Sequence, residues 1–277
     1  MGQRFRHSIC NEIYQGWDFA EACRHMKAAG YEGIEIAPFT LSEDPCNIPA
    51  ADRRQYREII EGEGLRFVGL HWLMVAPKGL HVTTPDDVLR ARSWEHIRGL
   101  IDLCADLGEG GVMVFGSPLQ RGTTGGSTRE EATQRFIEGL ASAAPRAEER
   151  GVTILVEALP KNQTDVIGSL AEAVEVVRAV GSPAVATMFD THNAVDETEP
   201  HEALIERYFP LIRHVHVNET DGGHCGTGDY NFRPVLAVLA RLGYQGWISL
   251  EAFDFTPGAE KIATESIRYL NSIIEEL

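Results

Sequence analysis

Charged side chains stand at the ends of four consecutive apolar runs in the second half of the chain. Glu157 ends the fifth such run and Asp190 ends the sixth. The seventh run carries His214 and His216, and the eighth ends in Glu251. A charge buried without a partner is costly, so each group needs either its own salt bridge to Lys or Arg or a shared cation. Because four successive runs end this way, we favour the shared cation.

Three carboxylates and one imidazole form an oxygen-rich ligand set that suits a divalent metal ion. We expect Mn²⁺, with Mg²⁺, Co²⁺ or Zn²⁺ as alternatives. His214 and His216 are two residues apart and share one face of a strand. His216 is nearer the end of the run and is the predicted ligand, whereas His214 is expected deeper in the protein or as a partner of a ligand.

The elements that must position these groups alternate regularly along the chain. Apolar, strand-like runs cover residues 4–10, 33–37, 65–71, 111–115, 152–158, 184–190, 211–217 and 246–252. Helical patterns lie near 17–29, 50–63, 85–107, 128–150, 167–180, 199–209, 231–242 and 257–276. Eight such units without an inserted second domain favour a closed (β/α)8 TIM barrel over a doubly wound sheet, as one domain over residues 1–277. In these barrels the site lies at the carboxyl ends of the strands.

Composition excludes several classes of protein. Lys and Arg total 25 against 41 Asp and Glu, and the net charge of −16 opposes nucleic-acid binding. No stretch reaches the ~18 apolar residues of a membrane-spanning helix, and the first residues lack the apolar run of a signal peptide. The five cysteines are scattered and never spaced as CxxC, which indicates reduced thiols and a cytoplasmic location.

Several segments carry a resemblance to a known family. IEIAPF, LVEAL, FDTHN, HVHVNE, GTGDYNF and GYQGWISLEAF resemble the xylose-isomerase-like barrel superfamily of sugar isomerases and epimerases, most closely the D-tagatose/D-psicose 3-epimerase group. The resemblance implies that Glu157, Asp190, His216 and Glu251 are metal ligands. It also implies that Glu157 and Glu251 are the two acid/base carboxylates and that Phe253 is an aromatic residue near the substrate.

The chain departs from the pattern of that group at three places. Gln163 stands where the family commonly has a substrate-binding Glu, and Asn193 stands where it has a histidine. Gly222 and Gly223 occupy the loop in which a substrate-binding Arg is expected. We predict substrate contacts from the following residues: Glu35, His71, Lys161, Gln163, His192, Asn193, Glu219, His224 and Phe253.

These residues predict a metal-dependent epimerase or isomerase acting on a ketose or a related polyol ketone. A metal that chelates the carbonyl and the adjacent hydroxyl stabilises an enediolate, and two carboxylates on opposite faces move the proton. The alternative is a dehydratase of the inosose or dehydroshikimate type on the same barrel. A DNA endonuclease is disfavoured by the charge, and a non-catalytic sugar-binding barrel is disfavoured by the complete ligand set.

Two further features are less decisive. The glycine-rich segment 116–127 lacks the GxxxxGK[ST] pattern; we interpret it as a lid rather than as an anion-binding loop with Arg121.

The expected partner is a small-molecule sugar, with neither nucleic acid nor membrane. A homo-oligomer is left open, because packing on the barrel explains the apolar stripe of the last helix.

Overall fold

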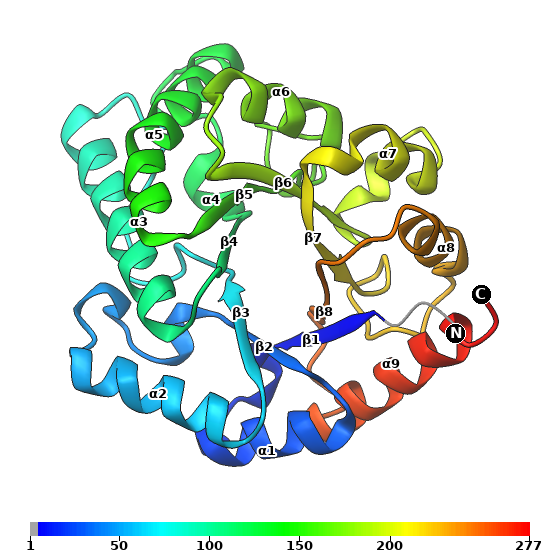
Figure 1. Ribbon diagram of the computed structural model, residues 1–277. Coiled ribbons are helices and arrows are strands. Elements are labelled where there is room, and N and C mark those ends of the chain that lie inside the picture. Colours follow the sequence, from blue (N-terminus) through cyan, green and yellow to red (C-terminus); the bar gives the residue numbers. More distant parts are fainter. Residues whose placement is uncertain (1–4) are drawn as a thin grey trace.

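The computed structural model describes residues 5–277, in which the strands pair in parallel and in sequence order until the last one pairs with the first (Figure 1). The strands are β1 (Arg6–Cys10), β2 (Gly33–Ile36), β3 (Arg66–Leu70), β4 (Val112–Phe115), β5 (Thr153–Val156), β6 (Val185–Asp190), β7 (Ile212–Val217) and β8 (Trp247–Leu250). The order β1 to β8 closes the sheet into a barrel. The predicted (β/α)8 TIM barrel is therefore confirmed.

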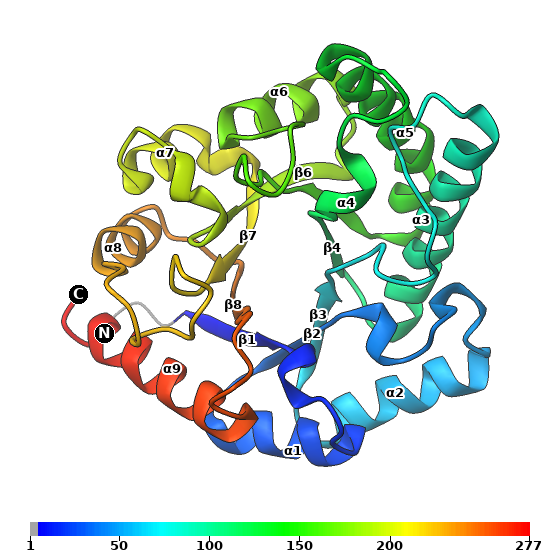
Figure 2. The same ribbon diagram turned by 180° about the vertical axis from the view of Figure 1, so that it is seen from behind.

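Helices surround the barrel on its outside, as both face-on views show (Figures 1 and 2). They are α1 (Phe19–Ala29), α2 (Ala50–Gly62), α3 (Asp87–Leu107), α5 (Arg129–Arg150), α6 (Leu170–Val180), α7 (His201–Tyr208), α8 (Arg233–Arg241) and α9 (Ala259–Ile274). The short α4 (Pro118–Arg121) lies instead directly after β4, inside this ring of helices. Short 3-10 turns lie at Asn11–Tyr14, Pro38–Thr40, Pro45–Asn47, Asn193–Asp196 and Phe209–Leu211. Each predicted strand and helix is present within a few residues of its expected bounds. Arg4, at the start of the first predicted strand, lies outside the described residues, and α4 was not predicted.

Local sequence signals explain where the helices begin. The Asp86 side chain accepts hydrogen bonds from the backbone N–H groups of Val88 and Leu89 at the start of α3. Thr128 and Glu131 form a reciprocal capping box at the start of α5. These contacts satisfy N–H groups that have no partner within the helix, so the predicted helix starts coincide with the observed ones.

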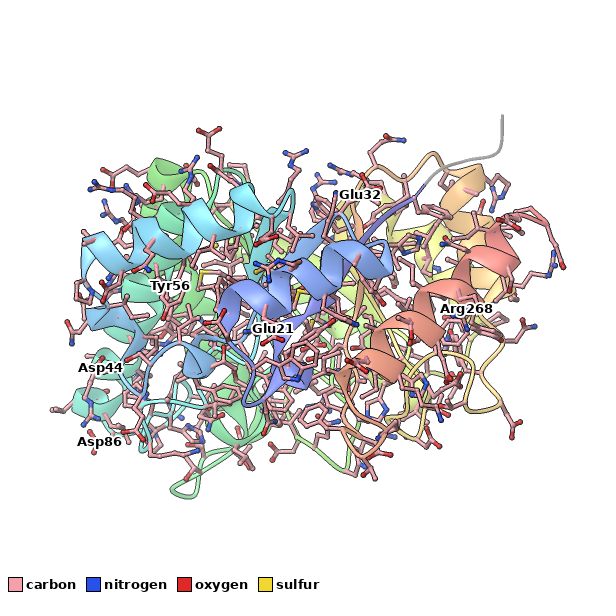
Figure 3. All side chains as sticks on the ribbon, turned by 90° about the horizontal axis from the view of Figure 1, so that it is seen from below. Glu21, Glu32, Asp44, Tyr56, Asp86 and Arg268 are labelled. Carbon is pink, nitrogen blue, oxygen red and sulfur yellow. The ribbon has the colours of Figure 1, made fainter. Side chains whose placement is uncertain are left out.

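The core has two layers. A small cluster fills the barrel interior from the middle strands and consists of Val114, Leu155, Ala186 and Met188. A much larger cluster lies between the strands and the helices. Charged side chains such as Glu21 on α1 and Arg268 on α9 lie on the outside (Figure 3). Within residues 5–277, no helix combines the length and the apolar character needed to cross a membrane.

Strand register brings the ends of the later strands to one level. Asp190 on β6 is paired with His216 on β7, and His216 is paired with Ser249 on β8, two residues before Glu251. Because neighbouring parallel strands end at the same edge, the polar residues at these ends face a common space.

Candidate active site and metal site

The carboxyl ends of β5 to β8 bring four predicted ligands together. Glu157, Asp190, His216 and Glu251, hereafter the tetrad, each offer one ligand atom, and these atoms all lie within 4.8 Å of one another. All four side chains are buried. Within residues 5–277, Asp190 Oδ2 has no hydrogen-bond partner, and the His216 Nδ1 atom lies 3.6 Å from it. A buried carboxylate oxygen without a hydrogen-bond partner, close to two more carboxylates, is typical of a site that binds a divalent cation.

His216 is oriented by a carboxylate on the opposite side of the barrel. Its Nε2 atom lies 3.0 Å from Glu35 Oε1, and its Nδ1 atom lies 2.9 Å from Glu251 Oε2. In the metal-free chain both ring nitrogens face carboxylate oxygens, with Nε2–H donating to Glu35, and Nδ1 is the nitrogen on the side of the tetrad. This arrangement fixes which nitrogen is available to a metal. Burial by itself lowers the pKa of His216, but the charges of Glu35 and Glu251 outweigh it and raise that pKa.

Around the tetrad, further histidines and carboxylates are paired with one another and fully buried. Glu35 Oε2 lies 2.8 Å from His214 Nε2, and His71 Nε2 lies 2.7 Å from Glu12 Oε2. Burial lowers the pKa of His214. For His71 burial acts in the same direction, but the charges of Glu12 and Glu35 raise its pKa to about 9. His214 thus lies deeper than His216 and shares its partner Glu35.

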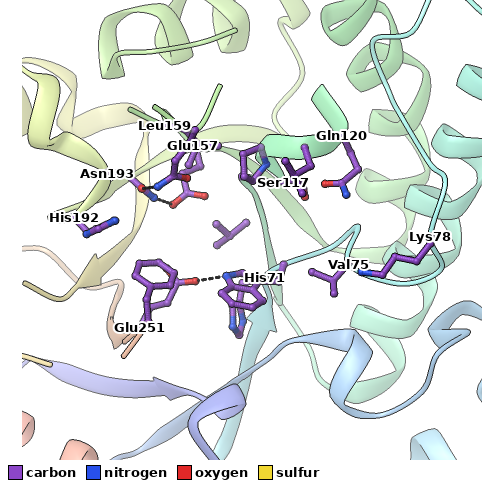
Figure 4. Close-up of a pocket in the computed structure, with 17 residues that line it drawn as sticks. His71, Val75, Lys78, Ser117, Gln120, Glu157, Leu159, His192, Asn193 and Glu251 are labelled. Atoms are coloured by element: carbon purple, nitrogen blue, oxygen red, sulfur yellow. Dashed lines mark hydrogen bonds between the residues drawn. The ribbon is translucent and has the colours of Figure 1, made fainter. Parts of the chain in front are cut away.

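A cavity of about 320 Å³ opens above the tetrad (Figure 4). Glu157 and Glu251 face it, and so do five of the nine predicted substrate contacts: His71, Gln163, His192, Asn193 and Phe253. These residues follow β3, β5, β6 and β8, as expected for a site built from the loops at one end of a barrel.

The other four predicted contacts do not line this cavity, contrary to expectation. Glu35 is fully buried beneath His216, because its side chain points into the barrel interior rather than toward the mouth. Glu219 accepts hydrogen bonds from backbone N–H groups of its own loop, at Gly226 and Tyr230. His224 Nε2 lies 3.2 Å from Glu265 Oε2, and the Lys161 side chain is exposed outside the cavity.

Each of the two acid/base candidates is held by a neutral N–H donor. Asn193 Nδ2 donates to Glu157 Oε1 at 2.9 Å, and Trp72 Nε1 donates to Glu251 Oε1 at 2.8 Å. Burial, followed by the charges of Asp190 and Glu251, raises the pKa of Glu157 to about 8. Burial also raises the pKa of Glu251. Gly116 leaves room for Glu157, because a Cβ atom there would lie 2.2 Å from Glu157 Oε2.

Arg121 lies behind the site, not in an anion-binding loop. Its Nη1 atom donates to the backbone oxygens of Phe115 and Glu157, at 2.9 and 2.7 Å. Burial lowers the pKa of Arg121 to about 10, although the charge of Glu157 acts in the opposite direction. The guanidinium is fully buried and ties the ends of β4 and β5 together, so the alternative role for Arg121 as an anion ligand is not supported.

Trp72 was not among the substrate contacts predicted from the sequence. Its position directly after His71, at the end of the third strand, was the available signal for its role at the site. Trp72 lines the cavity, as does Lys78, for which the sequence offered no specific signal. Ser117 and Gln120 also line it and belong to the segment 116–127 that we interpreted as a lid. These four residues follow β3 and β4 in the chain.

The metal-free chain is expected to lose stability as the pH rises from 7 to 9. The pKa values of Glu157 and His71 are raised to about 8 and about 9, so the folded chain binds more protons than the unfolded chain in this range. The free energy of unfolding therefore falls with pH, by about 3 kcal/mol. Urea unfolding in the presence of a chelator, at pH 7 and at pH 9, measures this change in the free energy of unfolding. H71N removes part of the slope, and an equal or higher free energy at pH 9 would contradict the expectation.

Comparisons with known proteins agree with this architecture. The family model described as "Xylose isomerase-like TIM barrel" matches residues 23–273. A probable ketose 3-epimerase of Synechocystis is 22% identical over 88% of this chain and 87% of its own length. An L-ribulose 3-epimerase of Methylomonas is 24% identical over 82% of this chain and 75% of its own. A crystal structure of D-psicose 3-epimerase in the presence of D-fructose shares the fold with a TM-score of 0.84, at 18% identity over 98% of this chain and 99% of that one. The chain belongs to the xylose isomerase-like TIM barrel family.

Proposed function

We propose that this chain is a metal-dependent sugar epimerase that inverts the carbon beside the carbonyl of a ketose or a related polyol ketone. The observation that carries the proposal is the pair Glu157 and Glu251, two buried carboxylates of the tetrad that face one cavity. The activities of two relatives, a probable ketose 3-epimerase and an L-ribulose 3-epimerase, support the same reaction class.

The two carboxylates divide the proton transfer between them. One takes the proton from the carbon on one face of the substrate, and the electron pair of the broken C–H bond delocalises into the carbonyl as an enediolate. The other carboxylate delivers a proton to the opposite face, which inverts the centre. A divalent ion, for which the tetrad offers the ligands and Mn²⁺ is our first choice, supplies Lewis acidity that stabilises negative charge on the substrate oxygens.

The walls of the cavity support this chemistry. Trp72 stacks on Phe253 with ring centroids 6.1 Å apart and planes 9° apart. His192 also lies against Phe253, with ring centroids 4.9 Å apart. Apolar walls exclude water, and burial makes carboxylates stronger bases by raising their pKa. Gln163, His192 and Asn193 supply polar groups for substrate hydroxyls.

We also infer a reducing, cytoplasmic environment for the chain. All five cysteines are free, and four of them are buried. Thiols in this state need no oxidising compartment for folding.

The proposed function is tested with purified chain, Mn²⁺ and candidate ketose pairs, first D-fructose with D-psicose and then L-ribulose with L-xylulose. We expect each member of a pair to form from the other, without loss of water. Nuclear magnetic resonance of the mixture identifies both epimers, and the chain kept in a chelator is the control. Formation of an absorbing enone would instead indicate a dehydratase, and failure to convert any ketose pair would refute the proposal.

A further inference from the structure

The two proton-transfer carboxylates are held in the same way by unrelated parts of the chain. Trp72, which follows β3, donates its indole N–H to Glu251 Oε1 at 2.8 Å. Asn193, which follows β6, donates its amide N–H to Glu157 Oε1 at 2.9 Å. In each case the donor is neutral and lines the same cavity as the carboxylate (Figure 4).

Trp72 is itself held firmly. Its ring lies between Phe253, at 6.1 Å, and Phe39, at 5.8 Å, with interplanar angles of 9° and 20°. Its backbone has φ = 49°, a left-handed conformation that a bulky residue rarely adopts. Such strain persists only where the surroundings enforce it, and it is concentrated at functional sites. The backbone conformation and the aromatic stack together place the indole N–H over Glu251.

Asn193 is held by its own set of hydrogen bonds. Its side-chain oxygen accepts from Gln163 Nε2 at 3.2 Å, which fixes the orientation of the amide. Its backbone N–H donates to Asp190 Oδ1 at 3.0 Å. The amide nitrogen is therefore directed at Glu157 by one residue of the β5–α6 loop and one metal-ligand candidate.

We propose that Trp72 and Asn193 are paired positioning residues, each of which orients one of the two proton-transfer carboxylates toward its own face of the substrate. The inference rests on the proposed function, because it assigns a separate role to each carboxylate. In Glu251, the second oxygen faces His216 and the tetrad at 2.9 Å, so Oε1 is the oxygen left to face the substrate.

Neutral donors suit this task better than charged ones. A Lys or Arg beside the carboxylate would stabilise its negative charge strongly and weaken it as a base. Indole and amide N–H groups do not lose a proton near neutral pH, so they orient the oxygen without competing for the substrate proton. A carboxylate oxygen that accepts one such bond keeps a second lone pair for the transfer.

The paired roles predict an asymmetric isotope signature in D₂O. When one carboxylate breaks the C–H bond of an epimer, the proton moves to that carboxylate and exchanges with solvent. Return from the same face gives the same epimer with deuterium, and delivery from the other carboxylate gives the second epimer with deuterium. Misplacing one carboxylate therefore blocks exchange into one epimer only, while the other epimer still exchanges through the intact carboxylate.

The experiment compares W72F and N193L with the unmodified chain, on the first ketose pair that the unmodified chain converts. W72F keeps an aromatic ring between Phe39 and Phe253 but lacks the N–H donor, and N193L keeps side-chain bulk but lacks the amide. We expect each variant to slow deuterium entry into one epimer by about 10²-fold, with the other within about threefold. The affected epimer must be opposite in the two variants.

Matched measurements separate positioning from general damage. F39L loosens the aromatic stack but keeps the N–H donor, so any loss that it causes should fall on the same epimer as in W72F and be much smaller. Calorimetric binding of Mn²⁺ and the melting temperature report whether the tetrad and the fold persist, and W72Y repeats the test if W72F does not fold. Equal losses in both epimers, the same affected epimer in both variants, or no loss would overturn the paired roles alone. A lack of deuterium entry with the unmodified chain on every pair would refute the proposed function as well.

Discussion

E251Q and E157Q are each expected to lower epimerisation by about 10³-fold or more. A glutamine amide keeps the shape of the side chain but cannot accept the substrate proton, so one face of the substrate loses its base. Each change also removes one negative oxygen from the tetrad, whose ligand atoms lie within 4.8 Å of one another. The loss is measured as kcat and KM with saturating Mn²⁺, so that weaker metal binding does not account for it.

A matched control for both variants is E58Q, because Glu58 is an exposed residue of α2 far from the cavity. Its kinetics should equal those of the unmodified chain. The two catalytic variants should keep the native melting temperature within a few degrees, since a neutral amide relieves part of the repulsion among the buried carboxylates. Turnover in E251Q or E157Q near the level of the unmodified chain would contradict the acid/base assignment.

Removal of divalent ions is expected to abolish turnover and to lower the melting temperature. Glu157, Asp190 and Glu251 repel one another at short range, and a bound cation removes that repulsion. An ion present at 100 times its Kd adds about 2.7 kcal/mol to the free energy of unfolding, which for a chain of this size corresponds to about 5–10 °C. Melting curves in a chelator, and after titration with Mn²⁺, Mg²⁺, Co²⁺ or Zn²⁺, measure the shift and rank the ions.

D190N provides the specific test of the ligand set, with D52N on the surface of α2 as its control. Asp190 Oδ2 has no hydrogen-bond partner in the part of the chain that the structure describes, so its replacement breaks little in the metal-free chain but removes a proposed ligand. We expect D190N to lose most of the metal-induced rise in melting temperature, whereas D52N keeps it. An equal rise in D190N and the unmodified chain would place the ion elsewhere.

The fold could be predicted from local patterns because each unit of a (β/α)8 barrel repeats the same two signals. A buried strand such as β6 is a nearly continuous apolar run, and the helix that follows is amphipathic. Capping residues such as Asp86 and Thr128 then mark the boundaries. The single-turn helix α4 escaped prediction because four residues carry no period and the surrounding glycines indicate only a loop.

The residues of the site fall into two groups, those at strand ends and those on loops, and only the first could be predicted from strand order. The meeting of side chains that end strands could be predicted, because barrel topology alone brings strand ends together and Asp190 and His216 are direct partners in the sheet. Residues on loops could not be assigned as reliably. Glu219 and His224 follow β7 as expected, but Glu219 accepts hydrogen bonds within its own loop and His224 lies against Glu265 of α9.

The sequence by itself determined the barrel and the four side chains of the tetrad, since both depend on strand order and on which residue ends each strand. Only the tertiary structure decided which neighbours complete the site. Glu35 lies beneath His216 and not at the mouth, because its side chain points inward from β2. Trp72, which follows β3, donates a hydrogen bond to Glu251 across the barrel. Contacts between strands on opposite sides of a barrel depend on side-chain direction and loop path, and neither is recorded in local sequence.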